Sequence, residues 1–256
     1  NDYNDLVRIT KRTGINAYHI SAIRCGYLLG SENFKFGSYE FRKGKSGVVH
    51  TTPLEEDLNR TLTNIRDAKR QSKVVVVSVH SHQFLGDDDE LEPEFIETFV
   101  HRCVDEGADV VICHGPHILR KIEIYHGHVI FHGLGNFICQ YELADYLPED
   151  FYRKYGRTRE TSDGVGDVYA TRSENGKKGM KAEDKYWKSK MVKMDVSDDE
   201  YKVEVYPIEL DRASGLPSIV ENDDILRKLI SMSENIPEIR IEDGKIQFIV
   251  NRRYDV

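Results

Sequence analysis

Two stretches near the start of the chain carry apolar residues at helical spacing. The shorter one spans residues 5–14 and ends on a glycine, and the longer one spans residues 51–71. In the longer stretch Thr52 suits the N-cap, Pro53 suits the first helical position, and Glu55 completes a capping box. The apolar residues of this stretch fall on one face: Leu58, Leu62, Ile65 and Ala68. The spacing predicts two helices.

Continuous runs of β-branched residues follow the predicted helices. Residues 73–79, KVVVVSV, form a run that is typical of a strand buried on both faces. A helix over 93–106, opened by a proline and ended by a glycine, leads to a second such run at 108–113. An apolar stretch at 15–23 predicts a further strand. Helix, strand, helix and strand with short connections favour a parallel sheet with crossover helices.

Alternating patterns predict hairpins in the rest of the chain. One surrounds the turn His126-Gly127, a second joins residues 186–196 to 201–210, and a third has Asp243-Gly244 as its turn. A helix capped by Asn222 or Asp223 lies between the last two. Between them these elements predict an α/β fold with a β-rich C-terminal extension.

One segment interrupts this regular pattern. Residues 142–185 contain 19 charged residues among 44 and no apolar periodicity. We expect a polar surface excursion there that lacks an apolar face and is mobile. The predicted organisation is therefore an α/β core over 1–141, the excursion over 142–185, and completing strands, helix and hairpin of the same domain over 186–256.

Composition narrows the class of protein. The chain has 256 residues, 39% of them hydrophobic, and a formal charge of −8, which argues against nucleic acid as a partner. No apolar run is long enough for a membrane span, and no signal-peptide pattern opens the sequence. These two sequence patterns therefore leave the cellular location unassigned. The four cysteines include no CxxC pair, which favours reduced thiols and a cytoplasmic setting.

Histidines are concentrated where the predicted parallel strands end. Eight of the ten lie between His80 and His132. His80 and His114 directly follow the two β-branched runs, and the carboxyl ends of parallel strands are where open α/β sheets bind ligands. A Gly-Pro turn brings His117 close to His114, and imidazole nitrogen is a common metal ligand. This pattern predicts that His80, His114 and His117 hold a metal.

Other histidines have a simpler interpretation. A single histidine at a strand end is more often a hydrogen-bonded polar group than a ligand, and we favour this for five of them: His19, His50, His101, His126 and His128. For His82 and His132 the two interpretations stay open.

The sequence resembles a known family in several blocks. These are VVVSVHSHQF, the helix and strands from PEFIETF to HGLGNF, and distal matches in YPIEL and LRKLISMS. Together they are similar to CapA-type proteins, the bacterial poly-γ-glutamate capsule synthesis proteins of the calcineurin-like metallophosphoesterase superfamily. The resemblance implies a four-layer αββα sandwich with a two-metal centre. The family's Gly-Asp, Asn-Leu-Glu and Asn-Asn-His motifs have no counterpart here, so the chain resembles the C-terminal part of such a protein.

The resemblance assigns expected roles to individual residues. His80, His114 and His117 match the family's metal histidines. Where the commoner family form reads His-Trp-Gly, this chain has His80-Ser81-His82, so His82 is expected to add a ligand or a proton donor. His82 or His117 is expected to protonate a leaving group. Asn136 matches a recurring position, and we expect it to contact substrate.

Two charged residues near the histidines have open roles. Arg120 either neutralises an anionic substrate or is a solvated charge at the edge of a strand. Glu123 either orients a ligand histidine without binding the metal itself or forms a surface ion pair.

The expected function is a CapA-like, metal-dependent hydrolase linked to poly-γ-glutamate capsule or related polymer synthesis. Its expected cofactors are two divalent metal ions in the intact protein, Mn, Fe or Zn, with at most one held weakly by these 256 residues. The expected substrate is an anionic small molecule or a polyglutamate-type chain. The alternative is a catalytically inactive accessory or scaffold protein of a capsule-type assembly.

Overall fold

The structure is a computed structural model that describes residues 2–13, 34–36, 39–41, 50–161 and 164–252. The chain divides into two compact units, residues 1–49 and residues 50–256. The first unit contains helix α1 (Asp2–Thr13) and an antiparallel pair, β1 (Phe34–Phe36) and β2 (Tyr39–Phe41). Helix α1 confirms the first predicted helix, whereas the strand predicted at 15–23 lies outside the described residues.

The second unit begins with a four-stranded sheet and its two crossover helices. Its elements are α3 (Glu55–Gln71), β3 (Val76–His80), α4 (Glu94–Asp105), β4 (Val110–His114), β5 (Ile122–Tyr125) and β6 (His128–Phe131). The strand order is β3-β4-β6-β5. Strand β4 lies parallel to β3 and β6, and β5 pairs antiparallel with β6. The predicted parallel strands and the hairpin at His126-Gly127 are confirmed.

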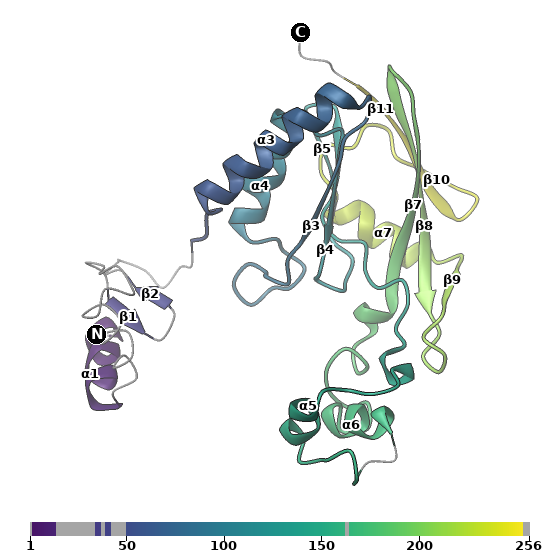
Figure 1. The fold of residues 1–256 in the computed structure, drawn as a ribbon. Coiled ribbons are helices and arrows are strands. Elements are labelled where there is room, and N and C mark those ends of the chain that lie inside the picture. The colour runs from purple at the N-terminus through teal and green to yellow at the C-terminus, as the bar shows by residue number, and fades with distance from the viewer. Residues whose placement is uncertain (1, 14–33, 37–38, 42–49, 162–163, 253–256) are drawn as a thin grey trace. The chain divides into compact units, whose positions relative to one another are not determined.

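Helices α3 and α4 cover one face of this sheet (Figure 1). Leu58 and Leu62 of α3 and Val100 of α4 pack in one cluster with Val77 and Val111 of the sheet. Each fully buried aliphatic side chain of this kind stabilises the fold by about 1.5–3 kcal/mol. The apolar face predicted for α3 is therefore the one that holds the helix on the sheet.

The predicted cap of α3 is wrong. The helix begins at Glu55, after Leu54 in an extended conformation, and no side chain caps it. Thr52 and Pro53 therefore lie before the helix. Acidic residues in its first turn favour this start instead, because they face the positive end of the helix dipole.

Strand β3 is buried on one face only, so the prediction of burial on both faces is wrong. Val75 and Val77 are buried against the helices, whereas Val76 is 54% exposed. The reason is the place of β3 in the sheet: it is an edge strand, and its face opposite the helices lines an open cleft between this sheet and a second one.

A second, antiparallel sheet packs on the open face of the first. Its strands are β7 (Lys188–Val196), β8 (Glu200–Leu210), β9 (Pro217–Ile219), β10 (Arg240–Glu242) and β11 (Lys245–Asn251), in the order β10-β11-β8-β7 with β9 on β8. Val203 of β8, Phe248 of β11 and Leu226 of helix α7 (Asp223–Met232) pack with Val110 and Phe131 of the first sheet in one core.

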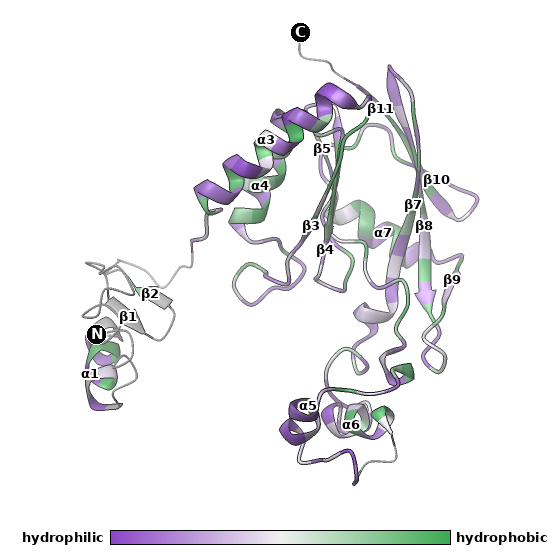
Figure 2. Cartoon of the chain, viewed as in Figure 1, coloured by the Kyte–Doolittle hydropathy of each residue, from purple (hydrophilic) through white to green (hydrophobic). Residues whose placement is uncertain are grey.

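Strands β3 and β4 are largely hydrophobic and α3 largely hydrophilic in Figure 2.

The predicted C-terminal elements are confirmed. Strands β7 and β8 form the expected hairpin, and β10 and β11 form the next one around Asp243-Gly244. Asn222 caps α7, because its Oδ1 accepts hydrogen bonds from the N–H groups of Asp224 and Ile225 at 3.1 and 3.3 Å.

The polar excursion has more structure than the sequence predicted. It contains α5 (Glu149–Lys154), α6 (Val165–Arg172) and two short 3₁₀ helices, Tyr141–Leu143 and Asp184–Trp187. Tyr152, Val165 and Val168 are buried. The expectation that this segment lacks an apolar face is therefore wrong, and its mobility stays a prediction.

The fold class is α/β with a C-terminal β-rich sheet, as predicted. Within residues 50–252, helices α3 and α4, the first sheet and the second sheet form three successive layers (Figure 1). The outer helical layer of the four-layer sandwich is not among the described elements of this unit. No helix in the described part of the chain is long and apolar enough to cross a membrane.

Candidate functional site

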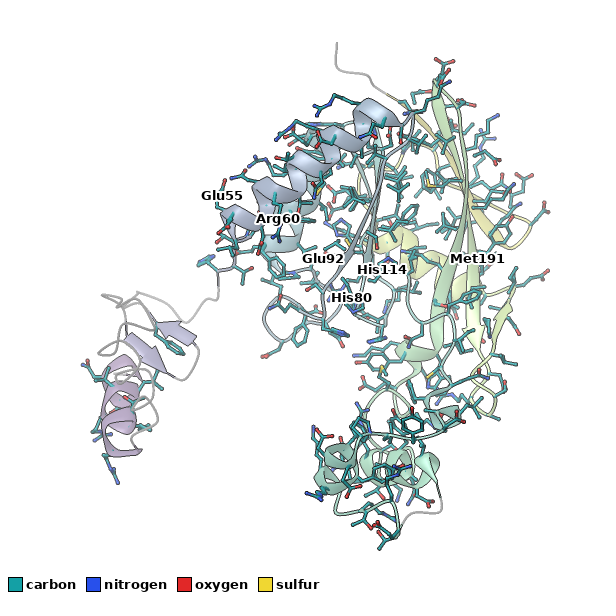
Figure 3. The ribbon with its side chains drawn as sticks, viewed as in Figure 1. Glu55, Arg60, His80, Glu92, His114 and Met191 are labelled. Carbon is teal, nitrogen blue, oxygen red and sulfur yellow. The ribbon has the colours of Figure 1, made fainter. Side chains whose placement is uncertain are left out.

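Two predicted metal histidines end neighbouring parallel strands. His80 and His114 are direct partners in the register of β3 and β4. The N–H of Ser81 donates to the carbonyl of His114 at 2.9 Å, which ties the two strand ends together. Both side chains lie at the same end of the sheet (Figure 3). The edge at which ligands bind in parallel sheets therefore carries two imidazoles side by side.

Two further histidines extend this cluster. The Nε2 atoms of His80 and His82 are 3.1 Å apart, and the ring of His82 lies 5.2 Å from that of His117, centroid to centroid. We call His80, His82, His114 and His117 the strand-end group. All four are exposed or half-buried, so solvent or a ligand reaches them.

The backbone of the His-Gly-Pro-His turn is constrained. Gly115 has a φ of +109°, and a Cβ there would lie 2.5 Å from the carbonyl oxygen of Ser81. Only glycine fits this close approach. His117 also has a positive φ, 63°, which is uncommon for a residue with a side chain and is often found at functional sites.

Asn136 fixes the protonation pattern of His117. The Nδ2 of Asn136 donates to the carbonyl of Tyr186 at 3.0 Å, which turns its Oδ1 toward His117. That Oδ1 lies 2.8 Å from Nδ1 of His117 and accepts its proton in a hydrogen bond. The neutral ring therefore keeps its lone pair on Nε2. Asn136 orients His117 in this structure, and its contact with substrate stays a prediction.

The strand-end group fits a metal only in part. Two nitrogens bound to one tetrahedral zinc at about 2.0–2.1 Å lie about 3.3 Å apart, close to the 3.1 Å between His80 and His82. Within the described ranges, however, no group of three or more His, Cys, Asp or Glu side chains is arranged to hold a metal ion. The residues present supply imidazole donors without the carboxylates that bridge two metals.

A second set of histidines bonds a buried carboxylate of the same sheet. Glu123 of β5 is 3% exposed and accepts from Nε2 of His101 at 2.7 Å and Nε2 of His132 at 2.8 Å. His132 has no exposed surface, and Glu92 lies 3.5 Å from its Nδ1. We call Glu123, His101 and His132 the buried group. His132 is thus an internal hydrogen-bonded residue, which is one of the two interpretations that the sequence left open for it.

The carboxylate of the buried group is held in its charged form. Burial raises the pKa of Glu123, but the hydrogen bonds from His101 and His132 outweigh it and hold that pKa well below its usual range. The bond to Glu123 in turn raises the pKa of His101. Glu123 therefore orients two histidines that were not predicted as metal ligands, and its action on a ligand histidine stays a prediction.

Arg120 anchors the loop that carries His82. Its side chain is 2% exposed, and its Nε and Nη2 donate to the backbone carbonyls of Asp89 and Gln83 at 2.8–3.1 Å. Lys185 adds an ion pair of 2.7 Å to the carboxylate of Asp89. The guanidinium thus fixes the loop that connects β3 to α4. The contact of Arg120 with an anionic substrate stays a prediction.

Lys190 is a buried charged residue that the sequence analysis missed. Its side chain is 3% exposed, and its Nζ donates to the carbonyl of Arg120 at 2.7 Å. Burial lowers the pKa of Lys190 to about 7, although Glu92 acts in the opposite direction. The alternation of β7 puts residue 190 on the same face as Val192 and Met194, and a lysine at an apolar position was the available signal.

A match to a family model decides the relationship to known proteins. The family described as "Bacterial capsule synthesis protein PGA_cap" matches residues 9–141, which is half of the chain and includes the whole strand-end group. The chain belongs to the PGA_cap family. The predicted resemblance to CapA-type capsule synthesis proteins is thereby confirmed.

Individual relatives match this chain over different lengths. "Uncharacterized protein y4sH" of Sinorhizobium fredii is 30% identical over 219 residues, which cover 79% of this chain and 47% of that protein. "PGA biosynthesis protein CapA" of Bacillus subtilis is 32% identical over 111 residues, 43% of this chain and 27% of the relative. A Mycobacterium tuberculosis protein, "Probable polyglutamine synthesis accessory protein", is 26% identical over 140 residues, 54% and 36% respectively. The chain spans about half the length of the Sinorhizobium relative, and less of the other two.

Proposed function

We propose that this chain is the histidine-bearing part of a CapA-like, metal-dependent hydrolase that acts in the synthesis of poly-γ-glutamate capsule or a related polymer. Family membership supports the capsule pathway. The observation that carries the hydrolase proposal is the pair His80 and His114 at the ends of adjacent parallel strands, with Nε2 of His82 3.1 Å from Nε2 of His80. Imidazoles gathered at a solvent-accessible strand end serve metal binding better than packing.

His80 and His82 would be the first donors to a divalent ion, with His114 and His117 beside them. Two bound metals supply a nucleophile by lowering the pKa of a bound water, and they stabilise charge on the reacting group. Since the imidazoles here carry no negative charge, we propose that the 256 residues hold at most one ion, weakly. Manganese, iron and zinc are the candidate metals.

His117 is the proposed proton carrier. Asn136 holds the proton on Nδ1, so Nε2 is the atom that would take up or deliver a proton. The ring of His82 lies 5.2 Å from that of His117, centroid to centroid, and would be a second proton acceptor only where it does not bind a metal. The loop bonds of Arg120 keep His82 in place for this exchange.

The proposed substrate is anionic: a phosphoester, a phosphoanhydride or a polyglutamate-type chain. All three place a negative oxygen beside the group that is attacked. The fold by itself does not choose among them.

Equilibrium dialysis followed by elemental analysis tests the proposal. The wild-type chain, dialysed against Zn²⁺ and separately against Mn²⁺, should bind about one ion, and His80→Ala should bind at least tenfold more weakly. His50→Ala is the matched control, because His50 is exposed and its Nδ1 bonds Glu94 away from the strand ends. Two tightly bound ions would mean that further ligands lie in this chain, and equal binding by both variants would refute the site.

Two observations favour a second candidate, an accessory protein without its own catalysis. The described residues include no group of three or more His, Cys, Asp or Glu side chains arranged to hold a metal ion, and the Mycobacterium relative is named an accessory protein. Absence of metal binding in the dialysis experiment, with the chain folded, would support this candidate.

A further inference from the structure

The polar excursion over residues 142–185 carries cations that pair with no carboxylate. In the rest of residues 50–252 most exposed lysines and arginines form ion pairs, for example Arg60 with Asp57 and Lys228 with Glu90. Five cations of the excursion have no ion-pair partner among the described residues: Lys154, Arg157, Arg159, Arg172 and Lys177. Tyrosine rings lie 5.8–5.9 Å from three of these, and Thr171 bonds a fourth. Unpaired cations gathered in a chain of net charge −8 indicate a surface for an anionic partner.

A cavity of about 530 Å³ lies beside α6 in this excursion. Arg157 and Lys177 line it together with two carboxylates, Asp167 and Glu174. Lys178 donates to only one of the two oxygens of Glu174. The wall therefore offers cations that pair with acidic groups and carboxylates that accept from N–H donors. A polyphosphate has acceptors only and suits the cations alone, whereas a chain with both carboxylates and amide N–H groups suits the whole wall.

A smaller cavity, about 60 Å³, lies on the other side of α6. Tyr169 and Arg172 line it, and Lys181 adds a second cation. In a helix of 3.6 residues per turn these two helix positions face away from Asp167 and Thr171, which line the larger cavity. A single small anion fills one of these cavities. A flexible chain with a charge on each repeat contacts the cations on both sides of the helix.

The end of the excursion is bonded to the strand-end group. The 3₁₀ helix Asp184–Trp187 supplies the carbonyl of Tyr186, which accepts from Nδ2 of Asn136 at 3.0 Å. It also supplies Lys185, which pairs with Asp89 of the loop between β3 and α4 at 2.7 Å. Helices α5 and α6 lie beyond the carboxyl ends of β3 and β4 (Figure 1). A chain held on the excursion is therefore at the end of the sheet that carries the imidazoles.

We propose that the excursion binds a flexible chain of amide-linked acidic residues and holds it beside the strand-end group. Its cations pair with the carboxylates of the bound chain, and the carboxylates of the larger cavity accept from the amide N–H groups. The excursion lies beyond residues 9–141, so the match to the family model does not assign it a role. The choice of polymer rests on the proposed function, whereas the binding itself needs neither metal nor turnover.

Fluorescence anisotropy with a short, labelled poly-γ-glutamate chain tests the proposal. A chelator is present, so no metal takes part. Arg172→Gln combined with Lys177→Gln removes one exposed cation from each cavity and should weaken binding about fivefold, because each exposed ion pair contributes little. Lys73→Gln combined with Arg102→Gln is the matched control, because it removes two exposed cations outside the excursion that also have no described carboxylate partner. The control should bind as wild type does, and equal Tm values show that both double variants are folded.

Two further polymers test the chemistry of recognition. Polyacrylate has carboxylates without amide N–H groups, and polyphosphate has acceptors only. At equal numbers of charges both should bind more weakly than poly-γ-glutamate, and added salt should weaken the binding of all three. Binding of either polymer as tight as that of poly-γ-glutamate would overturn the proposed class of ligand.

Trypsin protection locates the bound chain on the wild-type protein. With poly-γ-glutamate at about four times its Kd, cleavage after Arg159 and Lys177 should slow about fivefold, because only the unbound protein is cut there. Cleavage after Lys73 should continue unchanged. Equal affinities of the two double variants, or equal protection at all three positions, would overturn the proposal. Absence of polymer binding would refute the excursion site and leave the metal-binding result of the dialysis experiment as it stands.

Discussion

The two sets of histidines in this protein differ in what their ring nitrogens bind. In the buried group, Nε2 of His101 and of His132 donates to one carboxylate, that of Glu123, inside the sheet. In the strand-end group, the imidazoles contact one another and an asparagine, and these contacts include no carboxylate. The same residue type therefore serves stability in one place and stays accessible to a ligand in the other. Surroundings, more than the count of histidines, distinguish the two uses.

Removal of the shared carboxylate should give the largest loss of stability. Glu123→Ala leaves the buried His132 and the half-buried His101 without their acceptor, and we expect the free energy of unfolding to fall by about 3–5 kcal/mol. Denaturant unfolding measures it. Glu97→Ala is the control, because that side chain is 53% exposed and its pairing with Lys121 is loose, at 3.9 Å; its effect should stay within about 0.5 kcal/mol. Similar losses for both variants would remove the distinction between the groups.

Disturbing the turn under the strand-end group should have an intermediate effect. Gly115→Ala combines a positive φ with a Cβ 2.5 Å from a backbone oxygen, and we expect a loss of about 2–3 kcal/mol together with weaker metal binding. Gly86→Ala tests the φ alone, since Gly86 has a φ of +60° with open space around it, and should lose about 1 kcal/mol. Equal losses from the two variants would argue against the close approach at Ser81.

Lys190 is expected to have the smallest effect, which appears in how the free energy of unfolding depends on pH. Its folded pKa of about 7 lies below the ordinary value for lysine, so between pH 7 and pH 10 the unfolded chain binds more protons than the folded one. Stability from this residue therefore rises with pH, at no more than about 1.4 kcal/mol per unit. We expect Lys190→Met to flatten the pH profile of the unfolding free energy in this range. A parallel profile for the variant would mean that Lys190 stays protonated.

The sequence predicted the elements with local signals and missed those that depend on distant neighbours. The β-branched runs ending in His80 and His114, and the turn at Asp243-Gly244, are local patterns, and both were assigned correctly. The exposure of Val76 was missed because KVVVVSV has the same appearance in a central and in an edge strand. Sheet order is a property of the whole fold.

The candidate site shows the same limit. The strand-end positions of His80 and His114 followed from the strand pattern. The partners of Glu123 did not, because His101 comes from α4, 22 residues earlier in the chain. Arg120 also looked free to bind a substrate, and only the folded loop brings the carbonyls of Gln83 and Asp89 to it. Which polar groups are already satisfied cannot be predicted from spacing.

Histidine NMR during a zinc titration tests the central claim most directly. Ring ¹⁵N–¹H spectra of the folded chain report each imidazole separately, so one titration covers both groups. The account predicts that Zn²⁺ shifts the resonances of His80 and His82 first and perturbs those of His114 and His117, while His101 and His132 stay unchanged. Shifts at His101 or His132, or no shift in the strand-end group at saturating zinc, would contradict it.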